Sequence, residues 1–236
     1  MARYVIEVAD RPALPVHGQD GLFPVHRVFC VGRNYAEHAR EMGHDPDREP
    51  PFFFGKDAAA LTGASEVAYP PATADLHHEI ELVVALKAGG RNIAAARARE
   101  LIYGYAVGID LTRRDLQAVA KKLARPWYLA KSFIGAAPVG PIHPVEAVGH
   151  PREGAIRLEV DSEVRQDGDL AQMIWGVEEM IQILSEHDLL LPGDLIMTGT
   201  PAGVGPVRPR QRMTGSIAGL GAIEVTMTGE ATATGG

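Results

Sequence analysis

Residues 77 to 86 read H-H-E-I-E-L-V-V-A-L, a segment that begins with alternating polar and apolar residues and ends as a continuous apolar run. An alternation with a period of two is typical of a β-strand with one polar face. The apolar end indicates that the same strand continues into a core. We therefore predict one strand over residues 77–86 that carries Glu79 and Glu81 on the same face.

Further strands and short helices are expected on both sides of this strand. Residues 104–111 alternate again, so that Asp110 falls at the end of a strand, on the same small-residue face as Gly108. The 26 glycines and 17 prolines favour short strands and loops over a helical bundle. The pattern also predicts strands over residues 25–31 and 195–197 and helices over residues 35–42, 93–103, 113–122 and 173–184.

Length and charge limit the kinds of protein that this chain can be. Its 236 residues contain no internal repeat, so we expect a single domain, with residues 1–24 as an N-terminal extension and residues 230–236 as a flexible tail. Lys and Arg number 23 against 30 Asp and Glu, which gives a net charge of −7. This balance argues against a nucleic-acid-binding or anionic-membrane surface.

The distribution of apolar residues and the single cysteine indicate the compartment. The longest uninterrupted apolar stretch is the five residues Leu82 to Leu86, far too short to cross a bilayer. The first residues lack the apolar block of a secretory signal, and Cys30 has no second cysteine with which to form an intrachain disulfide. We therefore expect a cytoplasmic protein.

Three acidic residues form a candidate metal site. Glu79 and Glu81 lie two apart on the predicted strand, about 7 Å from each other along the backbone. Two such carboxylates repel each other unless a cation lies between them, and a divalent ion such as Mg²⁺, Mn²⁺ or Ca²⁺ supplies that charge. Asp110 is a third carboxylate at a strand end, where Gly108 leaves room. The alternative interpretation is a solvated sheet face.

A histidine and a glutamate form a candidate general base. His38 and Glu41 are three residues apart on a predicted short helix, which places them on one face. A carboxylate in that position holds an imidazole and raises its basicity, so the pair can remove a proton from water. A solvated surface pair is the alternative, and the spacing does not decide between them. His77 and His78 are better explained as supporting or packing residues than as ligands.

The segment from Gly193 to Gly205 reads G-D-L-I-M-T-G-T-P-A-G-V-G, a strand that leads into a glycine-rich loop. It lacks both the Lys-Ser/Thr ending of a Walker loop and the G-x-G-x-x-G spacing of a dinucleotide site. The loop therefore suits a small anionic substrate, which backbone N–H groups and the Thr200 hydroxyl would contact. Lys131 and Arg114 could supply cations for a substrate carboxylate, or they could be surface residues.

Taken together, several motifs resemble the fumarylacetoacetate hydrolase family, in order from about Val25 to Val225. They are C-V-G-R-N-Y-A-E-H-A-R-E-M-G (30–43), H-H-E-I-E-L-V-V-A-L (77–86), G-I-D-L-T-R-R-D-L-Q (108–117), P-W-Y-L-A-K-S-F (126–133) and P-G-D-L-I-M-T-G-T-P-A-G-V-G (192–205). The chain looks like the short bacterial form. The run G-H-D-P-D-R-E-P-P-F-F-F-G-K (43–56) is most similar to the fumarylpyruvate hydrolases of the gentisate pathway, which degrades aromatic compounds.

The resemblance implies an α+β fold, a mixed β-roll with flanking short helices, and a homodimer. It also implies one Mg²⁺ or Mn²⁺ per chain, held by residues matching Glu79, Glu81 and Asp110, and a water-activating pair matching His38 and Glu41. The residues that match its substrate contacts are Arg114, Gln117, Lys131 and Thr200; we also assign substrate binding to Arg33, and Lys131 belongs with the catalytic residues. One departure is visible in a late turn, where Arg210 and Gln211 replace the usual Gly-Asp.

The expected reaction is hydrolytic cleavage of a carbon–carbon bond in an acylpyruvate, with fumarylpyruvate giving fumarate and pyruvate. The ion would stabilise the enolate of pyruvate that forms when the bond breaks. The nearest alternative is decarboxylation of a 2-oxo acid such as oxaloacetate, because the same enolate forms. A non-catalytic protein that binds a metal or a small molecule on this scaffold is the alternative from another class.

Overall fold

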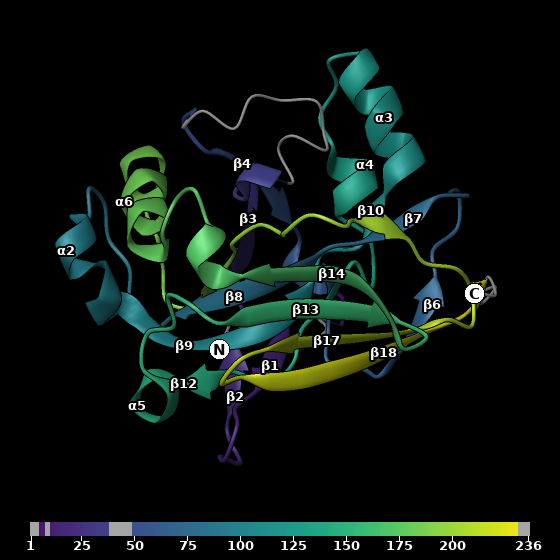
Figure 1. The fold of residues 1–236 in the computed structure, drawn as a ribbon. Coiled ribbons are helices and arrows are strands. Elements are labelled where there is room, and N and C mark those ends of the chain that lie inside the picture. Colours follow the sequence, from purple (N-terminus) through teal and green to yellow (C-terminus); the bar gives the residue numbers. More distant parts are fainter. Residues whose placement is uncertain (1–4, 8–9, 38–48, 231–236) are drawn as a thin grey trace.

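The computed structural model describes residues 5–7, 10–37 and 49–230, and it consists mainly of β-sheet with short helices at the periphery (Figure 1). The strands form one six-stranded sheet, one five-stranded sheet and three small sheets. This arrangement confirms the predicted α+β class with a mixed β-roll. Within the described ranges, no helix is both long and apolar enough to span a membrane.

The six-stranded sheet positions the candidate site through its central strands. Its order is β12 (His143–Pro144), β9 (Ile102–Ile109), β8 (Ile80–Leu86), β15 (Asp194–Met197), β3 (Arg27–Gly32) and β4 (Phe52–Lys56). β8 is buried along its whole length, because Leu82 and Val84 pack into one apolar cluster and Val83 and Ala85 into another. A strand that is buried on both faces needs no alternation, which explains the apolar run in the sequence.

The five-stranded sheet covers one face of β8 and β9, and Figure 1 shows it in front of them. Its order is β14 (Glu163–Asp169), β13 (Ala155–Val160), β17 (Arg212–Ile217), β18 (Gly221–Glu230) and β6 (Glu66–Tyr69). β13 alternates as a half-buried strand does, with Ile156, Leu158 and Val160 buried. These side chains share a cluster with those of β8, so the two large sheets enclose a common core.

Short elements complete the described structure. β7 (Leu76–His78) lies between β10 (Thr112–Arg113) and β16 (Gly205–Pro206), β1 (Ala13–Pro15) pairs with β2 (Leu22–Pro24), and β11 (Ala137–Pro138) pairs with β5 (Leu61–Thr62). The described α-helices are α2 (Ala95–Ala98), α3 (Arg114–Lys122), α4 (Tyr128–Lys131), α5 (Val145–Val148) and α6 (Val177–His187), and 3₁₀ turns cover residues 58–60, 99–101 and 170–172. Figure 1 places α3 and α4 together, apart from α2 and α6.

Two elements differ from the sequence prediction. The strand predicted over residues 77–86 is interrupted at Glu79, because β7 pairs with β10 and β16 while β8 joins the six-stranded sheet. The helix predicted over residues 93–103 is shorter: only Ala95–Ala98 is α-helical, and β9 already begins at Ile102. Ile102 is fully buried opposite Leu86 of β8, so pairing with β8 and burial outweigh the helix propensity of the preceding residues.

The late turn that departs from the family pattern contains a strained residue. Arg210 has a φ of 71°, in the left-handed region that glycine adopts without steric cost. Its backbone N–H donates to the Met227 carbonyl at 2.6 Å, and Gln211 donates its side-chain amide to Asp161 at 2.8 Å. The turn is therefore held in this conformation although it lacks a glycine.

Replacing Arg210 with glycine is expected to raise the free energy of unfolding by up to about 1 kcal/mol, or about 2–4 °C in melting temperature. Relief of the left-handed strain outweighs the entropy that glycine adds to the unfolded chain. Arg208→Gly is the matched control, since Arg208 is outside the left-handed region and glycine there should destabilise the fold. Equal losses of stability in the two variants would contradict the strain at Arg210.

One carboxylate joins the start of α6 to two arginines. Glu178 accepts hydrogen bonds from Arg99 Nε at 2.5 Å and from Arg152 Nη2 at 2.7 Å. Burial alone would raise the pKa of Glu178, but these two hydrogen bonds outweigh burial and lower its pKa to about 2. The ionised form of Glu178 is therefore favoured in the folded protein over the unfolded chain.

The stabilisation by Glu178 is expected to depend on pH. Because its folded pKa is depressed, the contribution is complete above the unfolded value near 4.5 and is lost as the pH falls toward about 2. Glu178→Gln should lower the free energy of unfolding by roughly 1 kcal/mol at pH 7, which corresponds to a melting temperature lower by about 2–4 °C. The difference in melting temperature between this variant and the wild type should become smaller below pH ~4.5. Glu186→Gln, at an exposed site of α6, is the control, and a gap that stays constant down to low pH would contradict the assignment.

Candidate metal centre and substrate cavity

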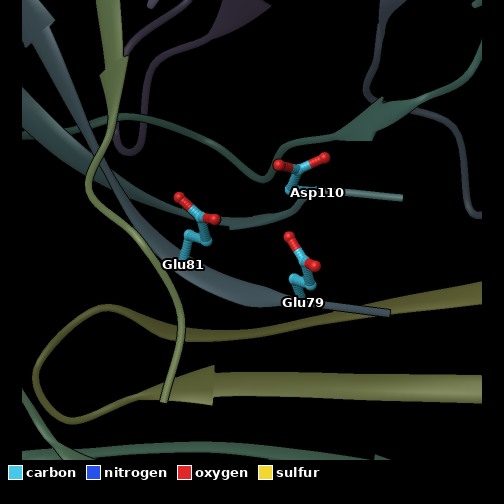
Figure 2. A group of neighbouring side chains, drawn as sticks. All are labelled: Glu79, Glu81 and Asp110. Atoms are coloured by element: carbon cyan, nitrogen blue, oxygen red, sulfur yellow. The ribbon is translucent and has the colours of Figure 1, made fainter. Parts of the chain in front are cut away.

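The structure brings the three predicted carboxylates together in one buried group. Glu79 lies in the break between β7 and β8, Glu81 is the second residue of β8, and Asp110 directly follows β9. One oxygen from each lies within 4.8 Å of the others, and the residues are only 5%, 2% and 0% exposed. Figure 2 shows Glu79 and Glu81 on one continuous segment of the chain, beside Asp110. This burial excludes the alternative of a solvated sheet face.

Backbone pairing fixes the spacing of these carboxylates. The Asp110 N–H donates to the Glu79 carbonyl at 2.8 Å, and Ile80 faces Ile109 across the two strands. Gly108 was expected to leave room beside Asp110, and this prediction is wrong. A Cβ at Gly108 would lie 2.5 Å from Val83 Cγ2, so the space beside this glycine is filled by the core and does not serve the carboxylates.

Three cations compensate part of the negative charge. Lys131, at the end of α4, donates from Nζ to Glu79 Oε2 and Asp110 Oδ2, each at 2.7 Å. Lys56, at the end of β4, forms an ion pair with Asp110 Oδ1 at 2.8 Å, and Arg114 donates to Glu79 Oε1. Burial disfavours charge on Lys131, but Asp110 and Glu79 outweigh burial and raise its pKa. Lys131 is therefore held as a cation beside the carboxylates.

Glu81 is the carboxylate that the protein compensates least. Burial, followed by repulsion from Asp110 and Glu79, raises the pKa of Glu81 well above its usual range. The Gly199 N–H donates to Glu81 Oε2 at 2.7 Å and only partly opposes this shift. A divalent cation would relieve the repulsion, and three carboxylate oxygens are the hard ligands that Mg²⁺ and Mn²⁺ prefer. The donor set therefore fits the expected ion.

The residues assigned to substrate binding share one cavity with two of the three carboxylates, Glu79 and Glu81. Arg114 donates from Nη1 to Gln117 Oε1 at 2.6 Å, which ties together two neighbouring residues of α3. Arg33 follows β3, and Thr200 lies in the loop after β15. The cavity is lined by Val31, Gly32, Arg33, Phe52, Phe54, Glu79, Glu81, Arg114, Gln117, Lys121, Trp127, Lys131 and Thr200. His38 and Glu41 lie outside the described residues, so their pairing stays a prediction.

The glycine-rich loop contacts one carboxylate of the candidate metal site, Glu81, through a backbone N–H. Backbone N–H groups of this loop were predicted to contact an anionic substrate, but the Gly199 N–H donates to Glu81. Gly199 has a φ of 93°, and a Cβ there would lie 2.8 Å from Asn34 Cβ. Both the conformation and the close approach therefore require glycine. Thr200, the residue after Gly199, lines the cavity as predicted for a substrate contact.

Gln166 of β14 is a buried residue that the sequence analysis missed. Its Oε1 accepts from the Ile80 N–H at 3.0 Å, between the two glutamates, and it also contacts His78 Nδ1 at 3.1 Å. Its Nε2 donates to Thr200 Oγ1 at 2.8 Å, which leaves the Thr200 hydroxyl proton free to point elsewhere. Gln166 thus connects β8 to the loop. His78 is buried, which lowers its pKa to about 4, so it acts as a neutral packing residue as expected.

Replacing Gln166 with leucine is expected to destabilise the protein by about 2–4 kcal/mol, because several buried polar groups lose their partner. Chemical denaturation would measure this loss. Gln211→Leu is the control, because Gln211 makes its hydrogen bonds at the exposed late turn and should cost less than about 1 kcal/mol. Similar losses in the two variants would contradict the connecting role of Gln166.

Comparisons with known proteins agree with this geometry. A crystal structure of fumarylpyruvate hydrolase from Pseudomonas aeruginosa, in complex with Mn²⁺ and pyruvate, is 50% identical with a TM-score of 0.94, over 97% of this chain and 100% of that one. The mitochondrial oxaloacetate tautomerase FAHD1 of Homo sapiens is 39% identical over 82% of this chain and 87% of its own length. The mitochondrial oxaloacetate decarboxylase of Dictyostelium discoideum is 37% identical over 82% of this chain and 89% of its own length.

The family assignment rests on most of the sequence. The family model described as fumarylacetoacetate (FAA) hydrolase C-terminal matches residues 27–228, a span that contains all three carboxylates and both large sheets except the last two residues of β18. The resemblance drawn from the sequence motifs is therefore confirmed, and this chain belongs to the fumarylacetoacetate hydrolase family.

Proposed function

We propose that this protein hydrolyses a carbon–carbon bond in an acylpyruvate, with fumarylpyruvate giving fumarate and pyruvate. The observation that carries the proposal is the buried group of Glu79, Glu81 and Asp110, of which the two glutamates line one cavity with Arg114 and Lys131. The related Pseudomonas aeruginosa structure, which contains Mn²⁺ and pyruvate, supports it at 50% identity. One Mg²⁺ or Mn²⁺ per chain would be held by the three carboxylates.

The bound ion would supply Lewis-acid stabilisation of the negative charge that develops on the pyruvate half. Lys131, itself buried, adds a fixed positive charge near the oxo acid, while Arg114 and Gln117 orient the substrate carboxylate. The Thr200 hydroxyl accepts from Gln166 and is thereby set to donate its proton to the substrate.

His38, held by Glu41, would act as the general base. It removes a proton from water, and the oxygen attacks the acyl carbonyl carbon, which becomes the new carboxylate. The bond between this carbon and the pyruvate methylene breaks, and its electron pair passes into the enolate of pyruvate. The proton taken from water then returns to that methylene carbon, so the overall change is the addition of one water.

Decarboxylation of oxaloacetate is the second candidate, because a relative of that name is 37% identical. The same enolate would form with loss of CO₂ in place of attack by water. A steady-state screen of fumaryl-, maleyl- and acetylpyruvate and oxaloacetate, with Mg²⁺ or Mn²⁺, separates the reactions by their products. Fumarate with pyruvate supports the hydrolase, and CO₂ supports the decarboxylase. Absence of turnover on every substrate would support a non-catalytic binding protein.

We also propose that the protein forms a homodimer. Tyr128 and Leu129 of α4 and the nearby Ile134 are 55%, 68% and 80% exposed, an unusual exposure for large apolar side chains. Light scattering after size-exclusion chromatography should give twice the mass of one chain.

A further inference from the structure

Two of the cations that line the cavity differ from the others in their partners. Lys56, Lys131 and Arg114 each form an ion pair with Glu79 or Asp110. Arg33 and Lys121 also line the cavity. Across residues 5–7, 10–37 and 49–230, however, neither of them forms an ion pair with a carboxylate. As far as the described part of the chain goes, their positive charges are therefore available to a ligand.

An aromatic wall joins these two cations. The Arg33 guanidinium carbon lies 5.2 Å from the centre of the Phe52 ring, and the Lys121 ammonium lies 5.3 Å from the Trp127 ring. Phe52 and Trp127 meet edge to face, with their ring centres 5.4 Å apart. A Cβ at Gly32 would lie 2.0 Å from the Phe52 ring, so the ring can occupy this position only because residue 32 has no side chain.

The charges in the cavity are strongly asymmetric. The carboxylates that line the cavity, Glu79 and Glu81, each accept from a cation or a backbone donor. The two charged groups that act most strongly on the Lys121 ammonium are themselves cations, Arg114 and Arg33. Burial, then repulsion from Arg114 and Arg33, lowers the pKa of Lys121. Like charges placed together beside an aromatic surface favour an anionic, flat ligand.

We infer that Arg33 and Lys121 bind a second carboxylate, at the far end of the substrate's acyl group, while Phe52 and Trp127 pack against its flat unsaturated part. The inference rests on the proposed function and assigns the residues that would recognise its substrate class, acylpyruvates whose acyl group is half of an unsaturated dicarboxylic acid. An arginine and a lysine recognise a carboxylate through charge-assisted hydrogen bonds. Acetylpyruvate, which ends in a methyl group, makes none of these contacts.

The test compares kcat/KM for fumarylpyruvate and acetylpyruvate in the ion-loaded wild-type, Lys121→Gln and Lys122→Gln proteins. Lys121→Gln should reduce the preference for fumarylpyruvate by about tenfold, mainly through KM, because one charge-assisted contact is lost. Lys122, the next residue of α3, does not line this cavity, and its variant should keep the wild-type preference. Equal losses on both substrates, or equal effects of the two variants, would overturn the inference, since they indicate general attraction of anions.

A binding measurement separates failure of this inference from failure of the proposed function. Fumarate and crotonate share the same alkene, but crotonate has a methyl group in place of the second carboxylate. Calorimetric titration of the Mn²⁺-loaded protein with pyruvate present should show fumarate binding about tenfold more tightly than crotonate. Lys121→Gln should reduce that difference, because Arg33 remains. Equal affinities in the wild type would overturn the carboxylate subsite, whether or not any acylpyruvate is hydrolysed.

Discussion

His38→Ala is expected to lower kcat by about 10²- to 10⁴-fold, the usual contribution of a general base. Water is a poor nucleophile until it loses a proton, and the carboxylates of the cavity are poorly suited to accept one. Glu79 and Asp110 are held by cations, and Glu81 accepts from the Gly199 N–H and is a proposed ligand of the ion. His38 lies outside the described residues, so this prediction rests on the helix spacing in the sequence and on the family resemblance.

The measurement combines steady-state turnover of fumarylpyruvate with a calorimetric titration of Mn²⁺. We expect His38→Ala to bind Mn²⁺ as the wild type does, because the proposed ligands are carboxylates. His187→Ala, at the exposed end of α6, is the control and should turn over normally. Unchanged kcat would remove His38 from the mechanism, and loss of Mn²⁺ affinity would place it among the ligands.

Glu81→Gln is expected to weaken Mn²⁺ binding by more than about 100-fold, beyond the range typical of an outer-shell residue. The same variant should make the ion-free protein more stable. Burial and repulsion from Asp110 and Glu79 raise the pKa of Glu81, so its ionised form opposes folding at neutral pH. A neutral amide of the same shape still accepts from the Gly199 N–H and removes the repulsion.

Opposite shifts are therefore expected in two melting experiments. Without the ion, Glu81→Gln should melt about 2–4 °C above the wild type, which corresponds to a gain of roughly 1 kcal/mol in the free energy of unfolding. With excess Mn²⁺ the order should reverse, because the wild type gains more binding energy than the variant. The wild-type ion-free protein should also gain stability as the pH falls through the raised pKa of Glu81. Glu66→Gln, on an exposed position of β6, should show neither effect, and an unchanged Mn²⁺ affinity in Glu81→Gln would contradict the ligand assignment.

The carboxylates were predictable because local patterns placed them. Alternation put Glu79 and Glu81 on one side of a chain segment, and a second alternating segment put Asp110 at a strand end. The break at Glu79 was not predictable, since it depends on the strands with which β7 and β8 pair. The sequence of residues 77–86 is compatible with one continuous strand or with two.

The groups that surround the carboxylates come from distant parts of the chain. Lys56 was visible only as the last residue of an aromatic segment, and its ion pair with Asp110 depends on β4 lying at the edge of the large sheet. Gln166 reaches the Ile80 N–H from 86 residues away. No local spacing marks such residues, because their role exists only once both sheets have formed.

A crystal grown with Mn²⁺ and measured at the manganese absorption edge tests the central claim most directly. We predict one anomalous peak per chain, bonded to oxygens of Glu79, Glu81 and Asp110. The opposite result would be a map in which Lys131 still bridges Glu79 and Asp110 and no manganese lies among the three carboxylates.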